Sequence, residues 1–531
     1  MRSLLLSGLG VTYRNSSYFD ATLFRDEIDE RAKAMLEHAG LAGVRIRNFS
    51  FLDGAVRRPL LRPPDPVPHL TSFTLESILE AAGQEYIRIP LEDVWTGLAT
   101  APAVDVDVIL LSTTYIWNRS MLGRALDWAR VHLPGVPIVA GGQYTNLKYA
   151  NIMRAYPDVA GVVRGDAESA LPLLLQTLAC HGDLGQVPNL VWRDGDRTRI
   201  NPLQYVDLET HPSPSFPGRL RSVPYESMRG CPFDCKFCSF PAASPKWRYK
   251  SAHKIAADWQ RYSAENGAES IDAMDSTFTV PPTRLRELTK ILPGAKVPHW
   301  SCFSRANVFT SPEFVEDLLA ANCANVEIGF ESMHDRTLKR MSKRVTAKQN
   351  RRAYELLSNS DLGFGTCFMV GYPGETAEEF EVTRRFIVDE HSGRFSLHLF
   401  SLSDETMPLW EDREELQIVV DDLLDPDSAW SHVGMNIDEA RKLQAETLDE
   451  VRRRNDTAVA SLWQREYQRP LLPTVGPRSN LVLEKAIERL ALCSRDHETV
   501  QEAAAAARSH VGELKEMGVE LDPGSPLESR P

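Results

Sequence analysis

The chain has 531 residues, with 60 Lys and Arg against 73 Asp and Glu, and a net charge of −13. A chain of this length holds several domains, and its acidic balance argues against nucleic acid or an anionic membrane surface as its partner. It has no run of about 18 apolar residues, and the apolar start at residues 4–6 is too short for a signal peptide. We therefore expect a cytoplasmic protein with no membrane segment.

Residues 1–190 alternate short apolar runs with amphipathic segments, which is the rhythm of a parallel sheet covered by helices. The expected strands are residues 3–9, 85–89, 106–112, 137–140 and 159–163, and the expected helices are residues 70–82, 121–132, 146–156 and 168–180. Residues 11–69 are dense in proline and are expected to form an irregular insertion. The order of these elements predicts a doubly wound, Rossmann-like domain.

Two loops of this domain have the composition of ligand loops. Ser112 and Thr113 end one expected strand, and Gly141, Gly142 and Gln143 follow the next. Loops at strand ends bind ligands in open α/β sheets, and paired glycines let a cofactor approach the backbone closely. A Gly-Gly pair after a strand also serves as an ordinary tight turn, so both interpretations stay open.

Residues 191–220 are expected to form a hairpin and a linker, with an Asp-Gly turn at 194–195 and a Pro- and Ser-rich stretch at 211–218. Strands and helices alternate again over residues 221–400 and give about six βα units, which indicates a second α/β domain. Residues 401–531 are expected to be mainly helical. The helices expected there are residues 437–468, 481–492 and 499–517.

Cys231, Cys235 and Cys238 open the second domain at the spacing C-x3-C-x2-C. Thiolates favour iron–sulfur clusters and zinc, and clustered cysteines in a reducing compartment indicate metal binding or catalysis. The nearest histidines, His211 and His253, lie outside the usual ligand spacing of a structural zinc site. Three thiols also make an odd number for a disulfide framework. A [4Fe-4S] cluster with one open iron is therefore favoured over zinc.

This loop, with Phe237 before its last cysteine, resembles the signature of the radical S-adenosylmethionine (SAM) enzymes. In that family the open iron chelates SAM, and an electron from the cluster cleaves SAM to a 5′-deoxyadenosyl radical. The resemblance implies SAM contacts by Phe237 and by the strand-end residues Asp275, Ser304, Arg305 and Glu331. Glu331 and Arg305 would hold the amino and carboxylate groups of SAM, since an arginine fork suits a carboxylate. Asp275 could instead cap a helix.

The first domain is similar to the cobalamin-binding domains that precede radical SAM domains in some enzymes. The resemblance implies that the loops at 112–114 and 141–143 line the nucleotide tail of cobalamin, and residues 163–168 resemble that family's closing segment. The D-x-H-x-x-G motif, which supplies a histidine to cobalt in other cobalamin domains, is absent. The expected fold is α/β, with a Rossmann-like cobalamin-binding domain at 1–190, a partial (β/α)6 radical SAM barrel at 221–400 and a helical C-terminal region.

The resemblance implies a methyltransferase that moves a methyl group from methylcobalamin to an unactivated carbon, or less often phosphorus, of a small metabolite, as in antibiotic biosynthesis. An sp3 carbon cannot attack SAM directly, so radical chemistry would activate it. The implied cofactors are a [4Fe-4S] cluster, SAM and cobalamin, with flavodoxin or ferredoxin as reductant. A cobalamin-dependent oxidative cyclase shares these motifs, and a non-catalytic cobalamin sensor would not need the cysteine loop. A tRNA methylthiotransferase would need a second cluster, yet Cys180 is the only cysteine before Cys231.

Two further features have more than one interpretation. Residues 336–352 are rich in Lys and Arg, which indicates either a solvated helix face or a docking surface for an anionic substrate or carrier. Trp430 and His432 lie just past the expected barrel and would either pack in the core or contact the substrate.

Overall fold

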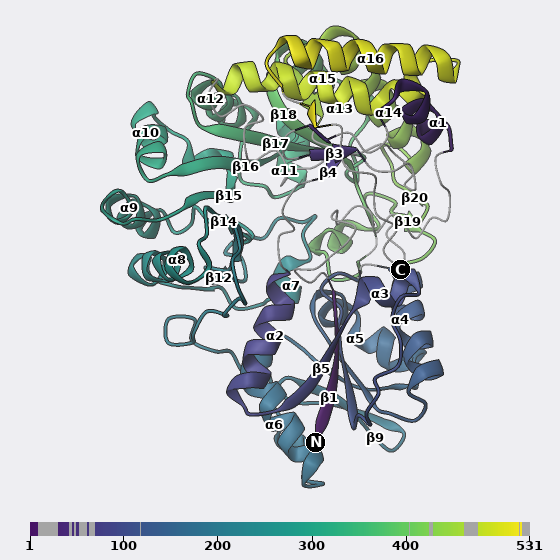
Figure 1. Cartoon of the computed structure of the whole chain (residues 1–531). Helices are drawn as coiled ribbons and strands as arrows, with labels where there is room; N and C mark the ends of the chain where they lie inside the picture. Colours follow the sequence, from purple (N-terminus) through teal and green to yellow (C-terminus); the bar gives the residue numbers. More distant parts are fainter. Residues whose placement is uncertain are drawn as a thin grey trace.

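The computed structural model describes residues 1–8, 30–41, 45–46, 49–51, 61–62, 69–116, 118–402, 404–423, 428–460, 476–519 and 521–522. Two seven-stranded sheets organise these residues. The first sheet and its helices lie at the bottom of Figure 1 and the second above them, with the C-terminal helices at the top. In the described part of the chain, every helix is too short or too polar to cross a membrane.

The first sheet has the order β10-β9-β8-β7-β6-β1-β5. Its strands are β1 (Arg2–Ser7), β5 (Glu85–Pro90), β6 (Val108–Ser112), β7 (Ile138–Gly141), β8 (Val159–Val163), β9 (Leu190–Asp194) and β10 (Arg197–Ile200). The chain leaves β1 first to β5 on one side and then to β6 on the other, which confirms the doubly wound order. The hairpin expected beside the linker, β9 and β10, extends this sheet as two antiparallel strands.

Both faces of the first sheet are apolar and covered by helices. Leu4 and Leu6 belong to one buried cluster and Leu5 to another, because successive residues of a strand face opposite sides. The helices are α2 (Leu70–Ala81), α3 (Leu91–Thr96), α4 (Arg119–His132), α5 (Gln143–Ala155) and α6 (Ala167–Ala179). The carboxyl ends of the parallel strands therefore share one edge, where the expected ligand loops lie.

The second sheet is parallel throughout and has the order β11-β14-β15-β16-β17-β18-β21. Its strands are β11 (Ser222–Tyr225), β14 (Ser270–Ala273), β15 (His299–Arg305), β16 (Cys323–Glu331), β17 (Gly363–Val370), β18 (Gly393–Leu399) and β21 (Ala458–Ala460). The covering helices include α8 (Ala252–Asn266), α9 (Pro282–Ile291), α10 (Pro312–Ala320), α11 (Asp335–Arg340), α12 (Ala347–Ser358) and α13 (Ala377–Arg385). The sheet is open, as expected of a partial barrel, and β21 adds a seventh strand.

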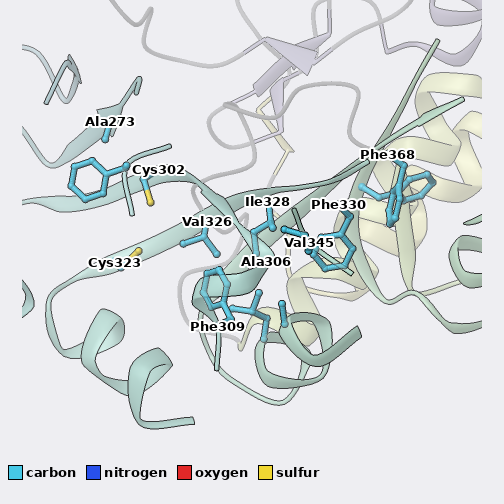
Figure 2. Close-up of a cluster of buried hydrophobic side chains, with 14 of the residues drawn as sticks. Ala273, Cys302, Ala306, Phe309, Cys323, Val326, Ile328, Phe330, Val345 and Phe368 are labelled. Carbon is cyan, nitrogen blue, oxygen red and sulfur yellow. The ribbon is translucent and has the colours of Figure 1, made fainter. Parts of the chain in front are cut away.

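The faces of this sheet differ in polarity. Val326, Ile328 and Phe330 of β16 are fully buried on the helix side, where Figure 2 shows them with other apolar side chains. Asn325 and Glu327 alternate with them and face the other side of the strand. The interior of a closed barrel is normally filled by branched apolar side chains. A polar inner face instead suits contact with a ligand.

The helix expected at residues 437–468 is shorter in the structure. Helix α14 (Ile437–Arg454) ends before Asn455, whose Nδ2 donates to the carbonyls of Ile387, Val388 and His391 at 2.8–3.2 Å. These bonds turn the chain into β21, and residues 461–475 lie outside the described residues. The helices expected further on are present as α15 (Pro477–Asp496) and α16 (Val500–Glu516).

Part of the expected insertion at 11–69 is regular. Helix α1 (Glu30–Ala39) buries Met35, Leu36 and Ala39 against α15 and α16, which Figure 1 shows side by side. Short strands β2 (Arg45–Ile46), β3 (Phe49–Phe51) and β4 (Leu61–Arg62) form a sheet with β22 (Leu521–Asp522). The expectation of an irregular segment was thus wrong for these residues. Apolar residues spaced i, i+1 and i+4 form one face of α1, and this face packs on α15 and α16. The rest of the insertion lies outside the described residues.

Candidate cluster and cofactor sites

The cysteine loop follows β12 (Met228–Arg229) and precedes α7 (Phe240–Ala243). Gly230 has φ +77°, and a Cβ there would lie 2.7 Å from the Lys246 carbonyl oxygen, so only glycine fits. The amide of Lys236 donates to the Met341 carbonyl at 2.8 Å, and its carbonyl accepts from the Leu409 amide at 3.0 Å. The loop is therefore held on both sides by the second domain.

The three thiols of this loop are free, with Cys235 buried and Cys231 and Cys238 half-buried. Burial raises the pKa of the Cys238 thiol to about 11, and the charges of the other two thiolates add to that effect. Among the described residues, no three His, Cys, Asp or Glu side chains form a site for a single metal ion. A [4Fe-4S] cluster binds one thiolate per iron. Three free thiols in one loop fit this donor set, with the cluster's fourth iron left to SAM.

Arg305, at the end of β15, lies directly beside the cysteine loop. Its guanidinium stacks on the Phe233 ring at 3.9 Å, and Nη1 donates to Cys235 Sγ at 3.5 Å. Nη2 donates to the Lys343 carbonyl oxygen, while the buried Nε has no hydrogen-bond partner among the described groups. A buried donor without a partner is costly. The Nε therefore fits the expected role of Arg305 toward the carboxylate of SAM.

Glu331 and Lys343 form an ion pair of 2.6 Å beside this arginine. Glu331 follows a bulge in β16 and has φ +62°, a strained value for a residue other than glycine. The Lys343 Nζ lies 5.4 Å from the centre of the Phe237 ring, and the side chain is buried. Strain of this kind clusters at ligand sites. A carboxylate beside an ammonium complements the ammonium and carboxylate of the methionyl part of SAM.

Lys343 is a site residue that the sequence analysis missed. It was counted within the basic run at 336–352, and its distance of twelve residues from Glu331 gave no signal of contact. The loop between α11 and α12 brings it back over the strand end. Phe237 of the cysteine loop, Arg305 and Lys343, which contact the loop, and Glu331, which pairs with Lys343, make up the candidate SAM site.

Asp275 and Ser304 differ from the expectation of SAM contact. Asp275 is buried, and its Oδ1 accepts from the amides of Ser227 at 2.8 Å and Met228 at 2.9 Å. The hydroxyl of Ser304 is buried and shares a hydrogen bond of 2.9 Å with Thr279. Both side chains therefore make their polar contacts within the protein. Asp275 fixes the backbone that leads into the cysteine loop.

The basic run at 336–352 is divided by its ion pairs. Arg340 contacts Glu379 at 2.6 Å, and Arg344 contacts Asp234 of the cysteine loop at 2.6 Å. Arg351 pairs with Glu390. The run spans two helices, α11 and α12, with Lys343 turned into the candidate SAM site between them. Neighbouring carboxylates thus neutralise much of the expected basic face.

Trp430 and His432 are packing residues in the structure. Trp430 is buried, donates through Nε1 to the Phe400 carbonyl at 3.0 Å and stacks on His432. The His432 Nδ1 accepts from the amides of Gly374 and Gly434 at 3.2 and 3.0 Å, and burial lowers the pKa of His432 to about 4. The other ring nitrogen, Nε2, bonds the Gly371 carbonyl at 3.2 Å, so both nitrogens of the neutral imidazole make hydrogen bonds within the protein. Of the two interpretations that the sequence left open, the contacts of Trp430 and His432 favour packing, and substrate contact stays a prediction.

The loops expected to bind cobalamin meet at the carboxyl edge of the first sheet. Ser112 is buried and pairs with Gly141 across β6 and β7. Thr113 donates to the Gly141 carbonyl through its amide at 2.7 Å and its hydroxyl at 3.0 Å, and its hydroxyl also bonds Thr145 at 3.0 Å. The threonine loop and the glycine loop therefore form one unit, with Thr113 as its internal link.

Gly142 is required by this unit. It has φ +117°, and a Cβ would lie 2.8 Å from the Thr114 amide nitrogen. The paired glycines were expected to give a cofactor close access to the backbone, and in the structure it is the Thr113–Thr114 backbone that approaches Gly142 closely. Gly142 caps α5 without a side-chain hydrogen bond, and the side chain of Gln143 is exposed. The N-terminus of α5 lies at this edge, and a helix N-terminus suits the phosphate of a nucleotide tail, so this edge fits cobalamin.

The polar inner face of the second sheet carries a titratable pair that the sequence analysis also missed. The Cys367 thiol of β17 donates to Glu327 Oε1 of β16 at 3.0 Å. Burial raises the pKa of Glu327 to about 7, although the Cys367 hydrogen bond lowers it. The alternation of side chains along β16 is the one sequence signal that could have placed Glu327 on this face. No signal in the sequence indicates that Glu327 contacts Cys367.

Two family models match the chain over the segments that hold these sites. A model of the radical SAM superfamily matches residues 225–387, which contain the three cysteines and the candidate SAM site. A model of the B12 binding domain matches residues 70–175, which contain the threonine and glycine loops.

Curated relatives with similar sequences are enzymes. The chain is 28% identical over 262 residues to an uncharacterised methyltransferase of Pyrococcus horikoshii, covering 47% of this chain and 57% of that protein. It is 23% identical over 250 residues to an anaerobic magnesium-protoporphyrin IX monomethyl ester cyclase of a Synechocystis species, covering 44% of this chain and 49% of that protein. The chain thus spans about half the length of these relatives.

A solved structure is similar over almost the entire chain. It is the radical S-adenosylmethionine methyltransferase TsrM of Kitasatospora setae, determined with cobalamin and a [4Fe-4S] cluster bound. The TM-score is 0.60 over 97% of this chain and 99% of that one, at 13% sequence identity. At this identity the similarity concerns the fold.

Proposed function

Because the chain belongs to the cobalamin-dependent radical SAM family, we propose that it is a methyltransferase acting on an unactivated carbon, or less often phosphorus, of a small metabolite. We call the carboxyl edge of the first sheet, with Thr113 and Gly142, the candidate corrin edge. The observation that carries the proposal is a hydrogen bond between a helix that starts at this edge and the helix that follows the cysteine loop. Asn146, near the start of α5, donates to the carbonyl of Ala243 in α7, the helix directly after the loop, at 3.2 Å. Two cofactor sites joined in this way can serve one substrate.

The family's cofactors are a [4Fe-4S] cluster, SAM and cobalamin. When bound, the cluster and SAM supply a hydrogen-abstracting radical, and cobalamin carries the methyl group. In this chain Cys231, Cys235 and Cys238 would hold the cluster. Arg305 and Lys343 would bind the carboxylate of SAM and Glu331 its ammonium, because these charges already lie beside the thiols.

The inner face of the second sheet is the proposed place of the substrate. Glu327 lies there with Cys367 and, with a pKa of about 7, carries a proton on a large share of molecules at neutral pH. A protonated carboxyl both donates and accepts hydrogen bonds, so it can orient a polar group of a metabolite. The proposed substrate is a small metabolite of a biosynthetic reaction, such as one of antibiotic biosynthesis, and a flavodoxin or ferredoxin is the proposed electron donor.

An oxidative cyclase is the second candidate, and the similarity to the Synechocystis cyclase favours it. Both reactions need the cluster, SAM and cobalamin sites described above. They differ in the fate of SAM, because only a methyltransferase consumes a second SAM as methyl donor. A non-catalytic cobalamin sensor would leave the anchored cysteine loop and the strained Glu331 without a use.

The test is anaerobic incubation of the reconstituted protein with methyl-deuterated SAM, a reductant, cobalamin and a pool of candidate metabolites. We expect 5′-deoxyadenosine and S-adenosylhomocysteine together, with the deuterated methyl group in a product. A variant with Cys231, Cys235 and Cys238 replaced by Ala is the control and should form no 5′-deoxyadenosine. Formation of 5′-deoxyadenosine and an altered product without S-adenosylhomocysteine would favour the cyclase instead.

A further inference from the structure

Two arginines lie opposite each other in the ribbon that leads into the cysteine loop. Strand β12 pairs antiparallel with β13 (Arg248–Tyr249), and the register places Arg229 directly across from Arg248. Arg229 lies two residues before Cys231. Like charges directly opposite in a ribbon destabilise it. The ribbon therefore needs carboxylates around it to hold this shape.

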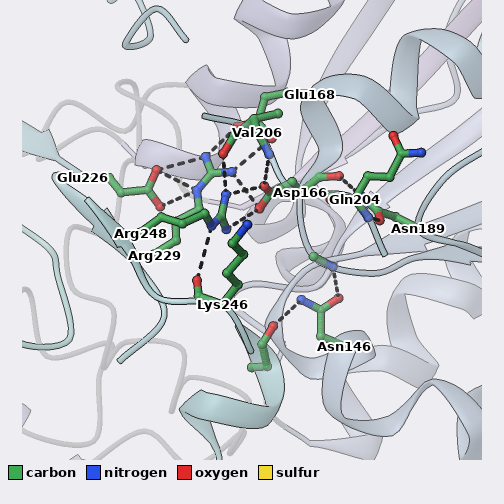
Figure 3. Close-up of polar contacts among 12 residues, drawn as sticks. Asn146, Asp166, Glu168, Asn189, Gln204, Val206, Glu226, Arg229, Lys246 and Arg248 are labelled. Carbon is green, nitrogen blue, oxygen red and sulfur yellow. Dashed lines mark hydrogen bonds and ion pairs between the residues drawn. The ribbon is translucent and has the colours of Figure 1, made fainter. Parts of the chain in front are cut away.

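The first domain supplies two of those carboxylates. Asp166 Oδ1 accepts from Arg229 at 3.0 Å, and Asp166 Oδ2 accepts from Arg248 at 2.7 Å. Glu168 accepts a two-pronged contact from Arg229 at 2.6 and 3.0 Å. Glu226 of the second domain also pairs with Arg229 at 3.0 Å. Figure 3 shows the two arginines converging on these carboxylates from both domains.

These charged groups are largely removed from water. Asp166 and Glu168 are 4% and 3% exposed in their side chains, and Arg229 is 16% exposed. Burial opposes ionisation of Asp166 and Glu168, but the arginines outweigh it and hold the pKa of both carboxyls below the usual range. Loss of one partner would leave a charge buried without compensation. The ribbon and the β8–α6 loop therefore depend on each other.

A second bridge connects the other end of the cysteine loop to the same place. Asn146 donates through Nδ2 to Ala243 of α7 and accepts through Oδ1 from the Gly165 amide at 3.1 Å. Asn146 lies in the first turn of α5, which begins directly after Gly142 of the candidate corrin edge. Segments on both sides of the cysteines thus contact the β8–α6 loop or α5.

We propose that Arg229 and Arg248, with Asp166 and Glu168, are positioning residues that couple corrin binding in the first domain to the order of the cysteine loop in the second. The proposal uses the family's cofactor sites and is independent of the methyl acceptor. The carboxylates and Asn146 lie at the corrin edge, while the arginines and Ala243 flank the three cysteines. A ligand that favours the docked arrangement at one site must favour it at the other, because the coupling free energy is reciprocal.

The coupling can be measured with hydroxocobalamin as the probe. Its dissociation constant is determined for the full-length protein without a cluster and after cluster reconstitution. For the wild type we expect tighter binding by the cluster-loaded form, by roughly 5-fold or more, the lower end of typical coupling between sites. In Arg229→Gln and in Asp166→Asn, the ratio of the dissociation constant without the cluster to that with the cluster should fall toward one. The matched control is Arg394→Gln, which breaks another buried arginine–carboxylate pair, with Glu484 at 2.6 Å, away from this interface. That control should keep the wild-type ratio.

Hydrogen exchange gives a readout that needs no cluster. In cluster-free wild type, hydroxocobalamin should slow exchange of the amides in residues 226–250, and in Asp166→Asn it should leave them unchanged. If a variant takes up no iron, this exchange comparison alone tests the coupling. If a variant does not fold, the milder Glu168→Gln is measured in its place. A wild-type ratio of one would overturn the proposal. So would a folded Arg229→Gln or Asp166→Asn protein with the wild-type ratio and the wild-type protection.

Discussion

The ion pair between Glu331 and Lys343 gives the candidate SAM site its charge pattern at the residue scale. Glu331→Gln and Lys343→Met should each weaken SAM binding by one to two decades, because loss of a charge-assisted hydrogen bond costs about 1.5–3 kcal/mol. Equilibrium dialysis of the cluster-loaded variants measures this. Glu390→Gln, which removes an exposed partner of Arg351, is the control and should bind SAM as the wild type does. Unchanged affinity in both site variants would remove this pair from the SAM site.

Glu327 should make stability depend on pH. Burial raises its folded pKa from 4.5 to about 7, so the native state binds a proton that the unfolded state releases. The stabilisation is complete below pH 4.5 and is lost as the pH rises through 7, and its size is about 3 kcal/mol as an order of magnitude. The urea midpoint at pH 5.5 minus that at pH 8 should therefore be larger for the wild type than for Glu327→Gln. Equal differences would show that Glu327 is already ionised in the folded protein. Glu375, with a pKa raised to about 8 by burial, contributes with the same sign in both proteins.

The residue types at the sites were predictable only where chemistry is local in sequence. Three cysteines within one loop indicate a metal cluster, and Arg305, which the resemblance assigns to the SAM carboxylate, lies beside Cys235. The place of Lys343 in the site could not be predicted, because only the folded loop between α11 and α12 brings it into contact with Glu331. The sequence does not distinguish a buried carboxylate that holds backbone amides, as Asp275 does, from one that holds a ligand.

At the scale of elements, the joined threonine and glycine loops determine the shape of the corrin edge. Gly142→Ala should push the Thr113–Thr114 backbone away from α5, because the added Cβ would lie 2.8 Å from the Thr114 amide. We expect hydroxocobalamin to bind at least about tenfold more weakly, a loss of about 1.4 kcal/mol. Gly135→Ala is the matched control. Gly135 also has a positive φ, of +82°, but a Cβ there meets no atom within 4 Å. Equal affinities of the two variants would show that the contact with Thr114 does not determine corrin binding.

Strands and helices were predictable from the sequence where their apolar residues recur at one regular spacing. The five strands predicted for the first sheet begin and end within a few residues of their limits in the structure, since buried parallel strands read as short apolar runs. Strand β21 was hidden because three residues give no periodic signal, and its pairing with β18 comes from the turn at Asn455. Helix α1 was hidden in a proline-rich segment whose partner helices lie more than 400 residues away.

At the scale of the molecule, the two α/β domains form one working unit. The corrin edge of the first sheet contacts both flanks of the cysteine loop through the arginine–carboxylate network and Asn146. The C-terminal helices cover the second sheet from the far end, where Glu484 of α15 pairs with Arg394 of β18. Each cofactor site is built within one domain, while their relative position depends on contacts between domains. Removal of one cofactor should therefore weaken ligand binding at the other site by the coupling factor without abolishing it.

Metal and corrin content of the reconstituted protein tests the central claim, that one chain holds a [4Fe-4S] cluster and a corrin in separate sites. The wild type should contain about four irons and one corrin per chain. The variant with Cys231, Cys235 and Cys238 replaced by Ala should contain no iron and still bind one hydroxocobalamin at saturating concentration. About eight irons per chain, iron that survives the triple substitution, or a wild type that binds no corrin would contradict the account.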